Sequence, residues 1–277
     1  MVYADLNVRH GGRVCVAELQ RLGFAAVAVN AEYGSGDKPK LASALQPLPL
    51  TASDNNSKGN SKTIKKAKLY TPATSNALQL TSASNDGTPT KRQVQQLKRT
   101  TVKAEDMNGA LAINSSTAIK SFDIVAAEAT SAKVFQYLCE QADVDIITFD
   151  VTNRIPFQIK RPWVDAAIKR SIYFEITYTP CLGDSAGRRY FFSNASNLVR
   201  LTGGRHLLLS SGASRDILLR SPYDVINIGI LIGLTYGQAL DAISTSCAQV
   251  IAHAEKRRNK ADFVVKTTGD QDVVMKD

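Results

Sequence analysis

Short apolar runs alternate with helical patterns along most of the chain. Seven runs have strand character, and several are apolar at consecutive positions, as expected when both faces of a parallel strand are covered. They occupy residues 3–8, 25–30, 97–104, 123–128, 145–150, 171–178 and 206–212. This alternation predicts an α/β protein, a distorted TIM-like β/α barrel of about seven parallel strands. An open doubly wound sheet is the alternative.

Capping residues and apolar spacing mark the helices between these strands. Ser131 suits the N-cap of one helix, and Pro162 suits the first turn of another. An apolar helix is expected over residues 222–234, and Thr235 with Gln238 predicts a capping box for the last helix. The expected inner stripe of that last helix is Ile243, Cys247, Val250 and Ala254.

One segment interrupts the alternation. Residues 34–93 are rich in Ser, Thr, Asn, Pro and Lys, and Tyr70 is their only aromatic residue. Such a segment buries too little apolar surface to offset its ordering entropy, so it is predicted to be a disordered insert. Its lysine-rich stretch at 57–68 could be an import signal, an RNA-binding arm or a solvated linker. The predicted organisation is therefore two barrel strands in residues 1–33, the insert at 34–93, the rest of the barrel at 94–254, and a flexible mixed-charge tail at 255–277.

The charge balance points to a polyanionic partner. The 277 residues include 34 Lys and Arg against 25 Asp and Glu, a formal net charge of +9. Such an excess favours nucleic acid over neutral metabolites. The first ten residues lack a signal-like apolar stretch, and the longest apolar run, at 225–234, is too short to cross a bilayer. A soluble, intracellular protein with no membrane partner is expected.

Candidate catalytic chemistry is sparse. The acids at predicted strand ends could hold a divalent metal, but such acids are more often bound by neighbouring basic groups; they are Asp5, Glu128, Asp150 and Glu175. The three histidines form no HxH or HExxH. The four cysteines are too widely spaced for a zinc cluster, so the cysteines are predicted to be reduced packing residues. No phosphate-binding loop or nucleophile elbow is present. We therefore predict no catalytic residue, metal or cofactor.

Cations recur instead at loops and helix starts. Arg188 and Arg189 begin a helical pattern, where free backbone amides already attract phosphate and arginine adds forked hydrogen bonds. Any one such pair can equally be a solvated helix end or a surface ion pair. The argument for RNA binding is therefore collective.

Several segments together resemble a known family. They are ADVDIITFD (142–150), IPFQIKRPWVDAAIKRSIYFEITYTP (155–180), DSAGRRYFFSNASNLVRL (184–201), HLLLSSGA (206–213), RSPYDVINIGILIGL (220–234) and AISTSCAQVIAHAE (242–255). In order and spacing they resemble the p30 protein subunits of nuclear ribonuclease P and the related ribonuclease MRP. The resemblance covers residues 142–255 well and the earlier strands more loosely.

The resemblance implies a barrel related to metal-dependent phosphoesterases, which usually carry HxH at the end of the first strand. Here that stretch is DLN, Asp5 to Asn7, so the first metal ligands are absent. It also implies a noncatalytic role in a ribonucleoprotein whose RNA removes the 5′ leader of precursor tRNA. The expected contacts to that RNA or to a partner subunit are Lys160, Arg161, Arg188, Arg189, Arg215 and Arg220.

Expected partners are ribonuclease P RNA, ribonuclease MRP RNA, precursor tRNA through the holoenzyme, a small ferredoxin-like subunit and other proteins of these complexes. The implied location is the nucleus and nucleolus. Two alternatives remain open at this point. One is a stand-alone phosphoesterase using the four strand-end acids, and the other is a basic scaffold that binds proteins rather than RNA.

Overall fold

The strands form one curled parallel sheet. The computed structural model describes residues 2–34, 37, 39–51 and 93–269. Within them the strands are β1 (Tyr3–Arg13), β2 (Phe24–Tyr33), β3 (Gln95–Ala104), β4 (Ile124–Ala129), β5 (Ile146–Thr148), β6 (Tyr173–Thr177), β7 (Leu207–Ser210) and β8 (Ala213–Arg215). Their order is β7-β6-β5-β4-β3-β2-β1-β8, and every pairing is parallel.

The two ends of this sheet meet. β7 and β8 stand at opposite ends of the strand order, yet only residues 211 and 212 separate them in the chain. Gly212 donates its backbone N–H to the Asn7 carbonyl at 2.8 Å, which ties this bend to β1. The predicted barrel is therefore confirmed over the open sheet. The single strand predicted at 206–212 ends at Ser210, and an eighth short strand follows it.

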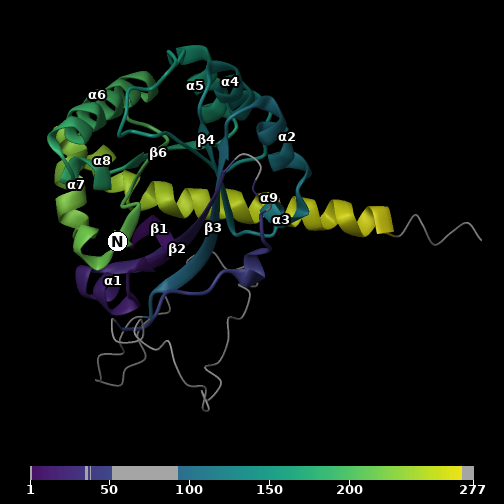
Figure 1. Cartoon of the computed structure of the whole chain (residues 1–277), viewed down its shortest axis with the longest axis horizontal. Coiled ribbons are helices and arrows are strands. Elements are labelled where there is room, and N and C mark those ends of the chain that lie inside the picture. Colours follow the sequence, from purple (N-terminus) through teal and green to yellow (C-terminus); the bar gives the residue numbers. More distant parts are fainter. Residues whose placement is uncertain (1, 35–36, 38, 52–92, 270–277) are drawn as a thin grey trace, which may run out of the picture.

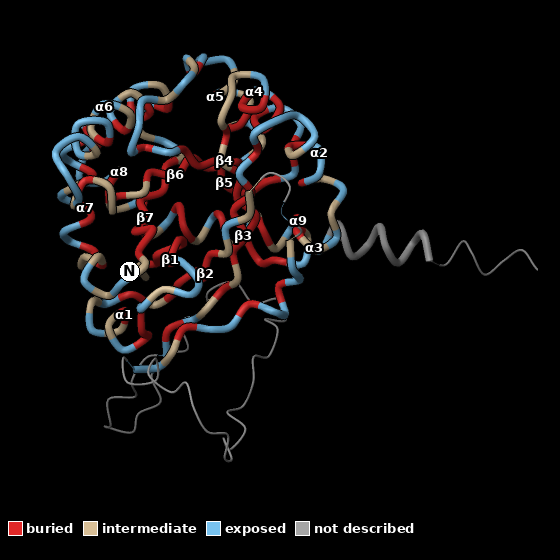
Figure 2. Tube along the Cα trace, in the orientation of Figure 1, coloured by how far each residue is buried: buried red, intermediate tan, exposed pale blue. Residues whose placement is uncertain are grey.

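Helices surround the sheet (Figure 1). The buried positions lie mainly along the strands that they cover (Figure 2). They are α1 (Val16–Leu22), α2 (Met107–Ser115), α3 (Thr117–Lys120), α4 (Ala132–Glu140), α5 (Arg161–Lys169), α6 (Ser185–Thr202), α7 (Pro222–Leu231), α8 (Tyr236–Ala242) and α9 (Thr245–Gly269), with 3₁₀ turns η1 (Ala42–Ala44), η3 (Thr179–Leu182) and η4 (Asp216–Leu218). No helix among the described residues is both long and apolar enough to span a membrane.

The predicted caps form as expected. Ser131 Oγ accepts the Val134 N–H at the start of α4, and Thr235 and Gln238 make a complete capping box at the start of α8. The last predicted helix, however, is two helices, because the helical conformation is interrupted between Ala242 and Thr245. The apolar helix α7 ends at Leu231 rather than at residue 234.

Helix α9 closes the amino end of the barrel. Cys247, Val250 and Ala254 are buried against the first residues of the strands, as the predicted inner stripe requires. The helix continues to Gly269, so the flexible tail predicted from residue 255 is wrong for residues 255–269. Residues 270–277 lie outside the described residues.

Part of the predicted disordered insert packs on the barrel. Ala42, Leu45 and Leu48 are buried in the cluster around β1 and β2, because apolar residues recur at every third position there. The backbone N–H of Val16 donates to the Pro49 carbonyl at 2.9 Å. The prediction is therefore wrong for residues 39–51, while residues 52–92, with the lysine-rich stretch, lie outside the described residues.

Strand β1 is longer than predicted and includes the HGGR sequence at 10–13. A Cβ on Gly12 would lie 2.5 Å from the Ser214 carbonyl oxygen, so glycine permits β8 to pair closely with β1. All four cysteines are buried and free, as predicted.

Candidate nucleic-acid interface

The six predicted contact residues lie at the carboxyl end of the barrel. Lys160 and Arg161 stand between β5 and the first turn of α5, and Arg188 and Arg189 lie in the first turns of α6 after β6. Arg215 ends β8, and Arg220 precedes α7. Because parallel strands all end on the same side, these loops share one end of the molecule. This end carries exposed cations from three successive connections.

The first pair is presented by Pro162. Lys160 is the N-cap residue of α5 and gives no side-chain cap, so its ammonium lies instead 5.0 Å from the centre of the Trp163 ring. Arg161 Nε lies 3.9 Å from Asp165 one turn later, and both side chains are more than half exposed. Both cations remain accessible to a ligand.

The two arginines of the second pair, Arg188 and Arg189, differ in their contacts. Arg188 donates through Nε to the Cys181 carbonyl at 3.0 Å and through Nη2 to the Gly183 carbonyl at 3.2 Å. It therefore fastens the turn after β6 to helix α6. Arg189 is exposed and makes no side-chain hydrogen bond or ion pair within the described part of the chain.

The third set lies beside the second. Arg220 donates through Nη1 to the Ile217 and Leu219 carbonyls at 2.8 and 2.7 Å. Burial raises the pKa of the Cys181 thiol, and the charges of Arg188 and Arg220 both oppose that rise. The structure therefore brings Arg188 and Arg220 together around Cys181. None of the described contacts joins Lys160 and Arg161 to them.

An ion pair that the sequence analysis missed fills the interior of the barrel. Arg99 on β3 donates to both carboxylate oxygens of Glu175 on β6, at 2.5 and 2.6 Å, and both side chains are fully buried. Burial alone raises the pKa of Glu175, but Arg99 and several hydrogen bonds outweigh it and leave that pKa below its ordinary value. Glu175 is therefore a carboxylate held by a guanidinium. The available signal was weak: Glu175 is the only acid in an apolar strand, but Arg99 is one of three basic residues in β3.

Polar side chains from neighbouring strands complete this network. Asn7 donates to Glu175 Oε2 at 3.2 Å, and Asn30 donates to Asn7 Oδ1 at 2.9 Å. Ser210 Oγ donates to Glu175 Oε1 at 2.7 Å, and Thr101 donates to Asn30 Oδ1 at 2.9 Å. The DLN stretch thus contributes an amide to the network, at the place where the resemblance leads one to look for a histidine ligand.

The four strand-end acids do not converge. Glu175 is engaged as above, while Glu128 lies 3.8 Å from Lys103 and has its pKa raised by burial. Asp150 accepts hydrogen bonds from Thr152 and Asn153 in its own loop. Among the described residues, no three His, Cys, Asp or Glu side chains are grouped as metal ligands.

Asp5 is the remaining strand acid, and no basic side chain contacts it among the described residues. Its Oδ1 accepts the backbone N–H groups of Asn7 and Ser211, each at 3.1 Å, whereas its buried Oδ2 has no partner. Burial raises the pKa of Asp5 to about 6. This carboxyl is a packing group with an energetic cost, not a metal ligand in a formed cluster.

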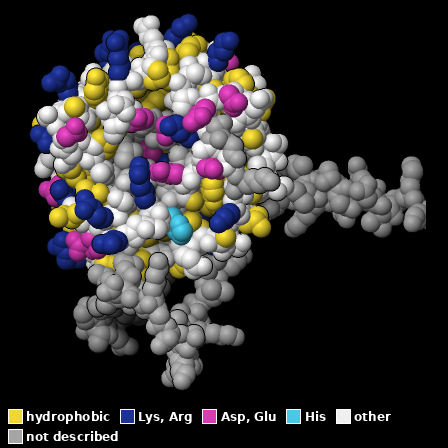
Figure 3. Space-filling view, in the orientation of Figure 1, with side chains coloured by type: hydrophobic (Ala, Val, Ile, Leu, Met, Phe, Trp, Pro, Cys, Tyr) yellow, Lys and Arg dark blue, Asp and Glu magenta, His cyan; other side chains and the backbone are white. Residues whose placement is uncertain are grey.

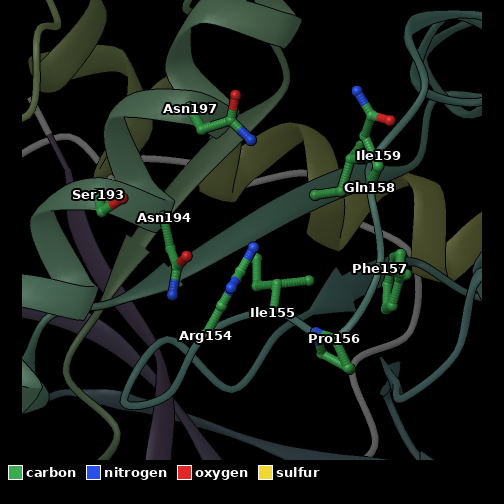
Figure 4. A pocket seen from close by; sticks show the side chains of 9 residues that line it. All are labelled: Arg154, Ile155, Pro156, Phe157, Gln158, Ile159, Ser193, Asn194 and Asn197. Atoms are coloured by element: carbon green, nitrogen blue, oxygen red, sulfur yellow. The ribbon is translucent and has the colours of Figure 1, made fainter.

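A polar groove opens between the loop before α5 and the middle of α6 (Figure 4). Its volume is about 700 Å³. Asn194 donates to the carbonyls of Val151 and Asn153, at 3.4 and 2.8 Å, and so holds the loop against the helix. Lys160 directly follows the lining residue Ile159 in the chain, and Arg189 precedes the lining residue Ser193 by about one turn of α6.

Comparison with known proteins decides the family. The model of the family described as RNase P subunit p30 matches residues 2–259. The chain belongs to this family. The resemblance drawn from the sequence is thereby confirmed.

Individual members of the p30 family are similar over part of their length. "Ribonuclease P protein subunit p30" of Mus musculus is 41% identical over 143 residues, 52% of this chain and 53% of that protein. "Ribonuclease P/MRP protein subunit RPP1" of Saccharomyces cerevisiae is 28% identical over 150 residues, 54% of this chain and 51% of that protein. The chain thus spans about half the length of these two relatives.

A solved structure supports the fold. A chain in the cryo-EM structure of archaeal ribonuclease P with mature tRNA superposes with a TM-score of 0.55. The superposition covers 95% of this chain and 93% of that chain at 13% sequence identity. At that identity the likeness establishes the shared barrel and nothing about contacts.

Proposed function

We propose that this p30-family protein is a noncatalytic subunit of the ribonuclease P ribonucleoprotein, shared with ribonuclease MRP. The observation that carries the proposal is the family match over residues 2–259, supported by relatives named as ribonuclease P and MRP subunits. The RNA of the complex performs the cleavage that removes the 5′ leader of precursor tRNA. The protein acts in the nucleus and nucleolus.

The chemistry of the barrel supports a binding role. Relatives of this fold that use metals need open ligands inside the barrel, whereas here the Arg99 guanidinium occupies Glu175 on both oxygens. Exposed Lys and Arg side chains are spread over the outside of the molecule (Figure 3), and the six candidate contact residues lie on the connections at its carboxyl end. We propose that Lys160, Arg161, Arg188, Arg189, Arg215 and Arg220 hold the RNA or a partner subunit there.

The first experiment is a gentle purification of the tagged chain from cells. The RNA that accompanies it is sequenced, the proteins are identified by mass spectrometry, and the eluate is assayed for precursor-tRNA cleavage. Ribonuclease P RNA, nuclease-sensitive cleavage and a small ferredoxin-like subunit are the expected result. An eluate without enriched RNA or activity refutes the proposal.

Matched variants separate the interface from general charge. Lys160→Gln with Arg189→Gln removes two cations at the carboxyl end, and Lys169→Gln with Arg205→Gln removes two exposed cations at the opposite end. RNA recovery should fall for the first protein and persist for the second. Equal recovery from both proteins argues for the scaffold alternative, in which protein contacts carry assembly.

A further inference from the structure

The groove between the loop before α5 and helix α6 combines three properties of a ligand site. It is large, about 700 Å³, and its only charged lining residue is Arg154. The side chains of Arg154, Gln158 and Ser193 make no hydrogen bond or ion pair with the described residues. Polar groups that serve no internal contact are thus collected around one space, with no carboxylate among them.

These groups offer donors and acceptors together. The side-chain N–H groups of Asn194 donate to the loop carbonyls, so its Oδ1 remains available as an acceptor. Asn197 accepts from Arg200 at 2.9 Å, which leaves its own N–H groups as donors. Gln158 on the facing loop supplies one of each (Figure 4). A phosphate needs donors only, whereas a nucleobase edge presents both kinds of group.

Cations frame the groove along the helix. Arg189, Ser193, Asn197 and Arg200 follow one another at helical spacings of four, four and three residues, so they share one side of α6. At the rise of an α-helix, the two arginines lie roughly 16 Å apart along the axis. Lys160 stands at the end of the facing loop. A ligand with bases in the groove can therefore place its phosphates near cations at either end.

We propose that this groove binds a short unpaired segment of RNA, reading the base edges with its amides and holding the flanking phosphates with Arg154 and Arg189. Duplex RNA does not fit this chemistry, since its Watson–Crick edges are paired and its major groove is too narrow for side chains. An extended peptide also carries donors and acceptors, but a cation-framed groove without carboxylates favours the polyanion. The inference rests on the proposed function in that RNA is the partner.

The test measures fluorescence anisotropy of the purified full chain with a labelled single-stranded RNA of about eight nucleotides, within the usual site sizes for such segments. The matching duplex is the second probe. The variant Gln158→Ala with Ser193→Ala keeps the charge, and Asn227→Ala removes an exposed amide on α7 outside the groove. Two lost hydrogen bonds should weaken single-strand binding roughly fivefold to twentyfold. Duplex binding, and both affinities of Asn227→Ala, should stay unchanged.

A second variant keeps the test independent of any local rearrangement. Arg154→Gln should lower the log–log salt slope of single-strand binding by about 0.7, the value for one phosphate contact. Single-strand affinities within twofold of wild type for both groove variants overturn the proposal. The proposal is also overturned if the groove variants lose affinity equally for single-stranded and duplex RNA. It is overturned as well if a neutral extended peptide binds the groove more tightly than single-stranded RNA does.

The outcome is separable from that of the proposed function. Recovery of ribonuclease P RNA with the tagged chain, together with normal single-strand binding by the groove variants, refutes the groove alone. Single-strand binding that the groove variants weaken as expected supports the groove even where no ribonuclease P RNA is recovered.

Discussion

Arg99 and Glu175 place two opposite charges inside the barrel, where neither reaches water. Removing two charges from water is costly, and the cost is offset only by good geometry and further hydrogen bonds. Arg99 meets both conditions, because it contacts both carboxylate oxygens and also donates to the Leu6 carbonyl at 2.7 Å. The guanidinium supplies the positive charge that keeps Glu175 ionised in the interior.

Removing one partner should therefore be more damaging than removing both. Arg99→Met leaves a buried unpaired carboxylate and should lower the free energy of unfolding by about 3–5 kcal/mol. Arg99→Met with Glu175→Leu should recover most of that loss. Urea denaturation measures both proteins, and Arg9→Ala, which removes an exposed ion pair to Glu32, should change little. If the free energy of unfolding of Arg99→Met equals that of wild type, the ion pair does not stabilise the fold.

Asp5 should give the protein a distinctive pH dependence. Its folded pKa is about 6, above the ordinary value of 3.8, so the folded protein binds this proton more tightly than the unfolded chain. The contribution of Asp5 to stability is therefore fully present below about pH 4, falls as the pH rises to about 6, and stays low above that.

The comparison with Asp5→Asn isolates this effect, because asparagine keeps an acceptor and does not ionise. From pH 4 to pH 7, the free energy of unfolding of the variant minus that of wild type should rise by about 2.5 kcal/mol, from a shift of roughly two pKa units. Urea denaturation at several pH values measures the difference. A constant difference would mean that Asp5 titrates as it does in the unfolded chain.

At this scale the sequence located exposed cations but did not reveal Arg99 as the partner of Glu175, for a physical reason. The exposed cations stand in pairs beside helix starts, which is a local signal. Arg99 belongs to a strand covered on both faces, so alternation does not tell which side chains point into the barrel. Its partner is 76 residues away in the chain, and only the closed sheet brings the two together.

At the scale of elements, strands and caps were predictable because their signals are local. The Ser131 cap, the Thr235–Gln238 capping box and the buried stripe of α9 all form as expected. The length of α9 was not predictable from local signals, since the sequence EKRRNK at residues 255–260 has no apolar residue to continue the inner stripe. Arg257 and Arg258 in this segment form ion pairs with Asp145 and Asp123, which precede β5 and β4.

Two ion pairs fasten α9 across the amino end of the barrel. Arg257 Nη2 lies 3.1 Å from Asp145 Oδ2 with both side chains buried, and Arg258 Nη1 lies 2.6 Å from Asp123 Oδ1. His253 Nδ1 also contacts Asp145 Oδ1, at 2.9 Å. The helix is thus attached at its apolar stripe and again one turn beyond it.

Arg257→Ala should loosen this attachment and cost about 3 kcal/mol, because it leaves Asp145 buried with less compensation. Hydrogen exchange should become faster in residues 245–258 and in the amino ends of β4 and β5. Lys256→Ala changes an exposed neighbour and serves as the control. Unchanged exchange in the Arg257 variant would show that apolar packing alone holds α9 in place.

At the scale of the whole molecule, strict alternation of strands and helices predicted the barrel, but not how it closes. Closure depends on the two-residue bend between β7 and β8 and on the approach of β8 to Gly12. Neither feature is marked by a periodic pattern of hydrophobic residues, so neither could be predicted from the sequence. The parallel direction of the strands also places three cationic connections at one end, which makes cations that are separate in the sequence one candidate interface.

The salt dependence of RNA binding tests that interface as a whole. Arg188 and Arg220 already donate to backbone carbonyls, whereas Lys160, Arg189 and Arg215 are not committed to hydrogen bonds or ion pairs among the described residues. The second group should therefore provide most of the phosphate contacts. Each phosphate neutralised contributes about 0.7 for single strands, or 0.9 for duplexes, to the slope of log affinity against log salt.

Replacing Lys160, Arg189 and Arg215 with glutamine should thus reduce the slope by about 2 to 3 for RNA bound by the purified chain. Titrations at several salt concentrations measure it. Lys169→Gln, Arg205→Gln and Lys256→Gln together remove the same charge away from the carboxyl-end loops and should leave the slope nearly unchanged. Equal slopes for the two triple variants would mean that RNA senses only the net charge, and the carboxyl end would then be free to bind protein.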